Sequence, residues 1–156
     1  MNVLVCSTPD SASVNLKNAI LSDDWIDYAD FHGSSAFLKD NLLLLTIKEH
    51  HVFYDDLDKE IVKELGVIAD NIIFLSKHKS ASEKKALTVH PIGNWADAKL
   101  GGKDNELTPS SPHLMSALLR SIKKSAAHLP DYDVVFEVTH HGPLLETPTL
   151  FMEIGS

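Results

Sequence analysis

Histidines stand out among the side chains that could do chemistry. The chain has nine of them in 156 residues, against a single arginine, Arg120. The most informative pair is His140-His141, in the segment EVTHHGP (137–143), which begins in an apolar, strand-like run and ends at a Gly-Pro turn. His90 follows another apolar run, residues 87–89. Because ligands and catalytic groups of open α/β sheets lie at the carboxyl ends of strands, these histidines are candidates for one site.

The chemistry that fits these residues is a metal centre or an acid–base centre. Zinc prefers imidazole and carboxylate ligands, and water bound to zinc loses a proton near neutral pH. The candidate metal ligands are His90, His140 and His141, and the candidate catalytic residues are Glu137, Glu153 and His90. A carboxylate inside an apolar strand needs a partner, a metal or a raised pKa. Neighbouring residues at a strand end point to opposite sides, so His140 and His141 are expected on different sides.

Other signatures are weak. The chain has no HExxH, P-loop, GxGxxG or GxSxG motif, so spacing alone does not establish a metal, and hydrogen-bonded structural histidines stay the alternative. The single cysteine, Cys6, excludes a disulfide framework and is interpreted as a buried, inert thiol. His50-His51 is a second-rank ligand candidate, and Trp95 is a residue that stacks on a base or pins its own loop.

The formal charge of −8 is unevenly placed. Residues 1–70 carry 5 lysines and 13 acidic residues, whereas residues 71–156 carry nine basic and nine acidic residues. The second half holds two basic clusters, which are Lys77, Lys79, Lys84 and Lys85, with His78 among them, and Arg120, Lys123 and Lys124. An acidic average speaks against a general nucleic-acid binder, but the clusters favour local phosphate contacts. A solvated surface is the alternative.

The elements that must position these side chains alternate between strand-like and helix-like segments. Strands are predicted at 3–6, 26–31, 42–47, 72–75, 87–89, 134–138 and 150–154, mostly as apolar runs typical of buried strands. Helices are predicted after Asp10, over 56–65 and from 111 onward, with Asp56 and Ser111 as N-caps and Gly66 as a C-cap. This alternation predicts an α/β fold with a mostly parallel or mixed sheet flanked by helices, in one domain over residues 1–156.

Length and composition set further limits. The 44% apolar content argues against disorder, and a chain of 156 residues has the size of one domain. The longest apolar run, 42–45, is far too short to span a bilayer, and no basic segment precedes the first strand. We therefore expect no membrane partner, a cytoplasmic location and, by default, a monomer. Residues 90–109 show no periodicity, and ordered loops of this length are often functional.

Three motifs, in order, resemble the archaeal and plant type of D-aminoacyl-tRNA deacylase. They are HPIGNW (90–95), EVTHHGP (137–143) and PTLFMEIGS (148–156), and the Ser-Pro-His at 111–113 resembles the same family. The resemblance implies zinc as cofactor and an α/β fold similar to phosphorylase and peptidyl-tRNA hydrolase. It implies hydrolysis of the ester between a D-amino acid and tRNA, which recycles the tRNA. Members of the family continue past the last of these motifs, so the resemblance also implies that this chain is the front portion of a longer fold.

If the chain hydrolyses D-aminoacyl-tRNA, as the resemblance implies, an activated water molecule attacks the ester. Glu137 or Glu153 would act as the general base, and His90 or His141 would protonate the leaving 3′-oxygen or bind the metal. The tRNA would contact both basic clusters through its phosphates. Two alternatives are another metal-dependent hydrolase on this scaffold, such as a peptidase or amidohydrolase, and a non-catalytic module that binds RNA or protein through its basic faces.

Overall fold

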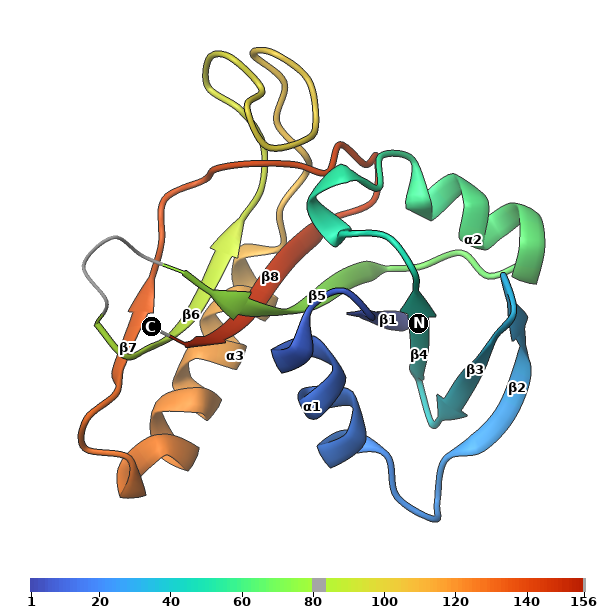
Figure 1. Cartoon of the computed structure of the whole chain (residues 1–156), viewed down its shortest axis with the longest axis horizontal. Coiled ribbons are helices and arrows are strands. Elements are labelled where there is room, and N and C mark those ends of the chain that lie inside the picture. The colour runs from blue at the N-terminus through green and yellow to red at the C-terminus, as the bar shows by residue number, and fades with distance from the viewer. Residues whose placement is uncertain (80–83, 156) are drawn as a thin grey trace.

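The structure is a computed structural model and describes residues 1–79 and 84–155. At its centre lies an eight-stranded sheet of order β2-β3-β4-β1-β5-β8-β6-β7 (Figure 1). The strands are β1 (Asn2–Ser7), β2 (Ile26–Phe31), β3 (Ser34–Lys39), β4 (Leu42–Ile47), β5 (Asn71–His78), β6 (Ala86–Pro91), β7 (Asp133–Phe136) and β8 (Thr149–Gly155). The helices are α1 (Ser11–Ile20), α2 (Leu57–Leu65) and α3 (Pro112–Ser125), with 3-10 turns η1 (His51–Phe53) and η2 (Ala126–His128).

The sheet is mixed, as the alternation of elements predicted. Strands β4, β1, β5 and β8 run parallel to one another, and β6 runs antiparallel to β8 but parallel to β7. At the other end, β3 pairs antiparallel with both β2 and β4. The carboxyl ends of four parallel strands therefore meet at one edge, whereas β6 ends in the opposite direction.

Strand β3 was not predicted. Its sequence, SSAFLK, has only the short apolar run Ala36 to Leu38, and it forms because a tight turn folds it back on β2. His32 and Gly33 both have positive φ, 53° and 76°, which is the geometry of a two-residue hairpin turn. The sequence therefore indicated this hairpin through its turn residues, His32 and Gly33, and not through the strand itself.

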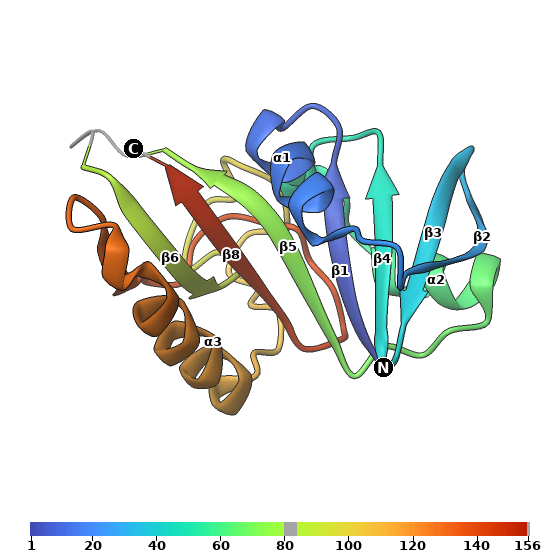
Figure 2. The same cartoon turned by 90° about the horizontal axis from the view of Figure 1, so that it is seen from below.

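The sheet is covered on both faces. Helices α1 and α3 lie on one face, and α2 lies on the other together with the long loop after β6 (Figure 2). Leu57 and Ile61 of α2 join a buried cluster with Phe74 and Phe151, whose rings stack at 4.8 Å. The helices of the other face pack on a second cluster that includes Leu75. None of the helices in the described ranges is long and apolar enough to cross a membrane.

All three predicted cap residues occupy the cap positions of their helices, but the two N-caps lack the expected side-chain hydrogen bonds. Asp56 and Ser111 stand before their helices, but neither side chain makes a capping hydrogen bond. Asp56 has a left-handed backbone, φ 58°, and its carboxylate instead pairs with Lys59 at 2.8 Å. Gly66 ends α2 in the left-handed conformation, as predicted. The side chain that does cap a helix is Asp10, which accepts from two backbone N–H groups at the start of α1.

The predicted buried strand at 134–138 is shorter and more exposed than expected. Strand β7 ends at Phe136, so Glu137 follows the strand rather than lying inside it. In the described part of the chain β7 pairs only with β6, which leaves its outer edge open. Val135 and Phe136 are accordingly exposed, and Val138 beyond the strand is 81% exposed.

Candidate functional site

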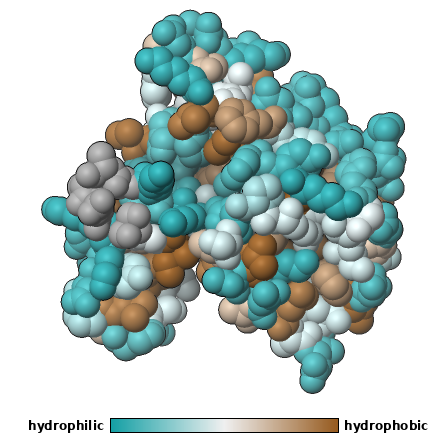
Figure 3. Space-filling view, viewed as in Figure 1, coloured by the Kyte–Doolittle hydropathy of each residue, from teal (hydrophilic) through white to brown (hydrophobic). Residues whose placement is uncertain are grey.

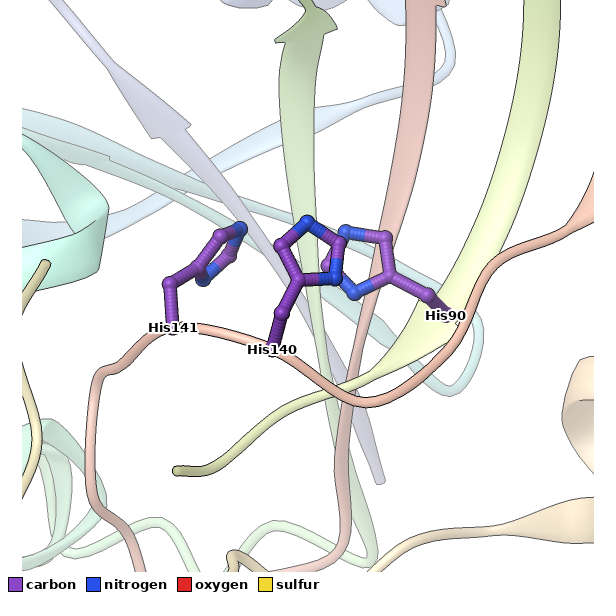
Figure 4. A group of neighbouring side chains, drawn as sticks. All are labelled: His90, His140 and His141. Atoms are coloured by element: carbon purple, nitrogen blue, oxygen red, sulfur yellow. The ribbon is translucent and has the colours of Figure 1, made fainter. Parts of the chain in front are cut away.

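The structure brings together the three histidines that the sequence proposed as ligands. One side-chain nitrogen each of His90, His140 and His141 lies within 4.8 Å of the others, and the rings gather above the same face of the sheet (Figure 4). The ring centroids of His90 and His140 are 4.3 Å apart, and those of His140 and His141 are 4.5 Å apart. His90 comes from β6, whereas the other two come from the segment that follows β7.

The backbone explains this convergence. Because β6 runs antiparallel to β8, His90 pairs with Phe151 in the middle of β8 rather than lying at the sheet edge. His141 has a positive φ of 45°, and the chain here makes only an isolated bridge between Ile92 and His140. The two neighbouring rings therefore lie on the same side. The expectation that they point to different sides is wrong, because this segment is irregular and not the end of a strand.

Each of the three imidazoles is fixed by a hydrogen bond of the same kind. In all three, Nδ1 donates to a backbone carbonyl, which leaves Nε2 for another partner. The accepting carbonyls belong to Pro91 for His90 (3.0 Å), Val138 for His140 (2.7 Å) and Gly142 for His141 (2.6 Å). The Nε2 atom of His90 is buried and has no hydrogen-bond partner among the described residues.

A second group of three residues lies beside the first. Atoms of His78, Glu137 and Glu153 also lie within 4.8 Å of one another. His78 Nδ1 is 2.9 Å from Oε1 of Glu137 and 3.3 Å from Oε2 of Glu153. The sequence proposed both glutamates but counted His78 only with the basic cluster. Its place at the end of an apolar strand, the same signal that drew attention to His90, was the clue to its role.

The two groups touch. Oε2 of Glu153 lies 3.7 Å from Nε2 of His90, and Oε2 of Glu137 lies 3.8 Å from Nε2 of His140. Five of these six residues were singled out by sequence as catalytic or metal-ligating. Together they place four imidazoles and two carboxylates in one continuous arrangement.

Burial and neighbouring charges set the protonation of this arrangement. Burial lowers the pKa of His141 to about 4, and the nearby imidazoles of His90 and His140 act in the same direction. Burial alone would raise the pKa of Glu153, but the imidazoles of His90 and His141 hold it below its ordinary value. At neutral pH, His141 is therefore a neutral imidazole and Glu153 an ionised carboxylate. The raised pKa that would suit Glu153 as a general base is not found.

The site opens into a cleft of about 490 Å³. One side is formed by groups already described, including His141 and Glu153, and the other by Asp10 and His51. His51 Nε2 lies 3.3 Å from Oδ2 of Asp10, which also accepts from the backbone N–H of Lys77 at 2.8 Å. Burial acts to raise the pKa of Asp10, but these partners lower it well below its ordinary value. His51, a second-rank ligand candidate, is thus held by Asp10, and His50 lines the same cleft.

The two predicted basic clusters lie on different faces. Lys77 and Lys79 line the cleft, and Lys79 and Lys84 line an adjoining depression of about 500 Å³ beside β7. Lys85 instead pairs with Asp131 at 3.7 Å. Arg120, Lys123 and Lys124 are carried by α3, which packs on the opposite face of the sheet (Figure 2).

The two remaining sequence candidates resolve differently. Cys6 is fully buried, and burial raises the pKa of its thiol, which agrees with an inert residue. Trp95 is 69% exposed, so its ring does not pin the long loop to the rest of the molecule.

With the site in view, comparison with known proteins shows the family. Residues 65–156 match the sequence model of a family described as D-aminoacyl-tRNA deacylase. The chain belongs to the D-aminoacyl-tRNA deacylase family. The resemblance carried by the three motifs is confirmed.

Known members are considerably longer than this chain. The D-aminoacyl-tRNA deacylase of Methanosarcina acetivorans is 44% identical over 162 residues, which covers 98% of this chain and 54% of that protein. The D-aminoacyl-tRNA deacylase of Thermococcus onnurineus is 36% identical, and the match covers all of this chain and 58% of that protein. A crystal structure of a conserved protein of unknown function, AF0625, matches with a TM-score of 0.92 at 32% identity, over all of this chain and 55% of that one. The chain therefore spans about half the length of the curated relatives that it matches.

Proposed function

We propose that this chain carries the hydrolytic site of a D-aminoacyl-tRNA deacylase, which cleaves the ester between a D-amino acid and tRNA. The observation that carries the proposal is the pair of adjoining residue groups at the cleft, one of three imidazoles and one of His78 with two carboxylates, in a member of this family. Relatives that cover nearly the whole chain bear the same enzyme name. We expect the enzyme to act in the cytoplasm, where aminoacyl-tRNA is made and used.

Zinc fits the histidine group. Imidazoles that bind metals usually donate their other ring N–H to a carbonyl or carboxylate, and His90, His140 and His141 all do so. The buried Nε2 of His90, which lacks a hydrogen-bond partner among the described residues, is the kind of atom that a metal satisfies. These three residues would hold the ion. When bound, zinc lowers the pKa of a water molecule and polarises a carbonyl group.

The roles of the carboxylates follow from their surroundings. Glu137 is the more exposed of the two, and its Oε1 lies 2.9 Å from Nδ1 of His78, a contact that orients it. We assign Glu137 as the base that takes a proton from the attacking water, and Glu153 as a buried carboxylate that holds its place beside His78 and His90. As the C–O bond of the ester breaks, the proton passes from Glu137 to the 3′-oxygen of the ribose. Free tRNA and the amino acid result.

The cleft also fits the rest of the substrate. Lys77, Lys79 and Lys84 lie next to the site, where phosphates of the acceptor end would be held without sequence readout. Val52 and Leu100 supply apolar lining in the same cleft. A pocket that accepts the side chain on one side of the Cα atom only would select the D-amino acid.

A deacylation assay tests the proposal. D-tyrosyl-tRNA and L-tyrosyl-tRNA are incubated with the chain and with the Methanosarcina relative, with and without a chelator, and bound metal is quantified. We expect preferential release of D-tyrosine, loss of release with chelator, and a loss of at least about 100-fold in His140→Ala. His113→Ala, an exposed histidine of α3, is the matched control and should retain activity.

Other results would favour the alternatives. Cleavage of peptides or small esters without cleavage of aminoacyl-tRNA would favour another metal-dependent hydrolase. If the unaltered chain and its His140→Ala variant bind tRNA equally well and neither hydrolyses aminoacyl-tRNA, the result would favour a non-catalytic module.

A further inference from the structure

The long loop between β6 and α3 is attached directly to the histidine segment. The N–H of Gly93 donates to the carbonyl of His141 at 2.8 Å, and the N–H of Gly142 donates to the carbonyl of Leu100 at 2.8 Å. Both bonds engage the single peptide group that joins His141 to Gly142, whose carbonyl accepts one bond and whose N–H donates the other. The loop therefore fixes the peptide group that directly follows His141.

The loop has little apolar packing of its own. Trp95, Leu100 and Leu107 are all exposed, so they do not form a core that would hold the loop in shape. In Figure 3, which has the view of Figure 1, the loop forms the largely hydrophilic lobe at the top, with hydrophobic side chains gathered at its base. The shape of the loop must therefore come from hydrogen bonds.

Asn94 supplies three of those bonds, which connect the beginning of the loop to its far side. Its side chain is buried, and its Nδ2 donates to the carbonyls of Gly101 (2.9 Å) and Lys103 (3.3 Å). Its backbone N–H donates to the carbonyl of Glu106 at 2.8 Å. One amide group thus ties the beginning of the loop to its far side, next to Leu100, which receives the bond from Gly142.

Close backbone packing transmits this arrangement to the site. A Cβ atom on Gly101 would overlap the carbonyl oxygen of Val52, and a Cβ on Gly142 would overlap the backbone of Gly101 and Gly102. These segments touch without intervening side chains. Movement of Gly101 therefore requires movement of Gly142 and of His141 beside it.

From these contacts we infer that Asn94 is a positioning residue, which holds the Nε2 atoms of His140 and His141 toward His90 by clamping the loop against Gly142. Ligand sites need their groups held to within about 0.5 Å, and loss of an outer hydrogen bond typically costs about 10- to 100-fold in metal affinity. The metal part of the inference rests on the proposed function. The clamp itself is a property of the polypeptide.

Metal binding by Asn94 variants gives the first test. The probe is Co²⁺ alone, followed by its visible absorption spectrum. In Asn94→Ala we expect affinity to fall by about 10- to 100-fold, with a changed spectrum. Asn94→Asp, which keeps the size but loses both donors, should behave alike. Lys103→Ala is the matched control, because Lys103 contributes only its backbone carbonyl, and it should bind as the unaltered protein does.

Ring tautomers give a second readout that needs no metal. In the metal-free protein, long-range proton–nitrogen NMR reports whether Nδ1 or Nε2 of each imidazole carries the proton. We expect His140 and His141 to be Nδ1–H in the unaltered protein and in Lys103→Ala, but mixed in the Asn94 variants. A thermal melt identifies any variant that fails to fold. If one of the two Asn94 variants does not fold, the inference is judged on the other.

The outcomes separate this inference from the proposed function. Unchanged tautomers and Co²⁺ affinity within twofold in a folded Asn94 variant would overturn the clamp. If the chain binds Co²⁺ and shows the expected Asn94 effects but its family relative does not cleave D-tyrosyl-tRNA, the proposed function fails and the clamp stands. If Co²⁺ does not bind, the tautomers alone decide on the clamp.

Discussion

The Nε2 atom of His90 lies 3.7 Å from Oε2 of Glu153, and this approach joins the two residue groups of the cleft. Both side chains are buried, so their interaction is little screened by water. Replacing either residue should therefore disturb the same site. We expect His90→Gln and Glu153→Gln each to weaken zinc binding. The loss of binding free energy in the double variant should be smaller than the sum of the two single losses by about 0.5–3 kcal/mol. Calorimetric titration of all four proteins measures this coupling, and additivity within about 0.5 kcal/mol would contradict it.

Metal removal should lower thermal stability. A ligand that binds only the folded state at 100 times its Kd stabilises it by about 2.7 kcal/mol. A chelator is therefore expected to lower the Tm of the zinc-loaded chain by several degrees. His140→Ala provides the comparison, because it removes a partly exposed ligand and should make the Tm insensitive to chelator. An equal chelator effect in both proteins would show that the ion binds elsewhere.

Asp10 should make stability depend on pH. Its folded pKa lies below the unfolded value of about 3.9, so its contribution is present above about pH 4 and is lost as the pH falls toward the folded pKa. Asp10→Asn should lose about 1–3 kcal/mol at pH 7, because an amide nitrogen would face the N–H of Lys77. The gap to the unaltered protein should shrink below pH 4. Urea unfolding at pH 7, 5 and 3 tests this, with the exposed Asp23→Asn as control.

Phe151 supports the site from beneath. Its ring is fully buried and stacks on His90 at 5.3 Å and on Phe74 at 4.8 Å. Phe151→Ala should cost about 3–5 kcal/mol of unfolding free energy and also weaken metal binding, because His90 loses its packing surface. Val138→Ala, which changes an exposed apolar side chain, should stay within about 0.5 kcal/mol. Denaturant unfolding and metal titration on the same samples give both values.

The two basic clusters can be separated by salt dependence. Lys79 and Lys84 line the depression that adjoins the cleft. The variant with alanine at both positions should therefore bind tRNA more weakly and reduce the salt slope by about one for each phosphate that is no longer neutralised. Lys123 and Lys124 lie on α3, across the sheet. The corresponding double variant tests whether this second cluster also binds tRNA, as the sequence predicts. Equal effects of the two double variants would mean that tRNA reaches both faces.

Local sequence signals predicted most of the fold. Unbroken apolar runs indicated the central strands, such as β4 and β5, because buried parallel strands need apolar side chains on both faces. The apolar run of strand β3 extends only from Ala36 to Leu38, and this strand was missed. Its existence depends on the turn at His32-Gly33 and on pairing with β4, which a periodicity scan does not register.

The site was predictable as far as residue types go, but not in its geometry. The motifs indicated His90 and the His140-His141 pair. The role of His78 depends on the register that places β5 beside β8, and the Asp10 to His51 pairing joins residues 41 positions apart. The direction of the His140 and His141 rings depends on the left-handed turn at His141. Each of these is decided by tertiary packing, which no short segment contains.

The position of β8 has a consequence for how the molecule assembles. This strand is the last described element in the sequence, yet it lies between β5 and β6 and pairs with both. Until residues 149–155 have emerged from the ribosome, β1 to β5 and β6 to β7 have no shared strand to join them. Glu153 arrives on that same strand. Closure of the sheet and completion of the cleft therefore depend on the same strand, so the cleft is incomplete until the sheet is whole.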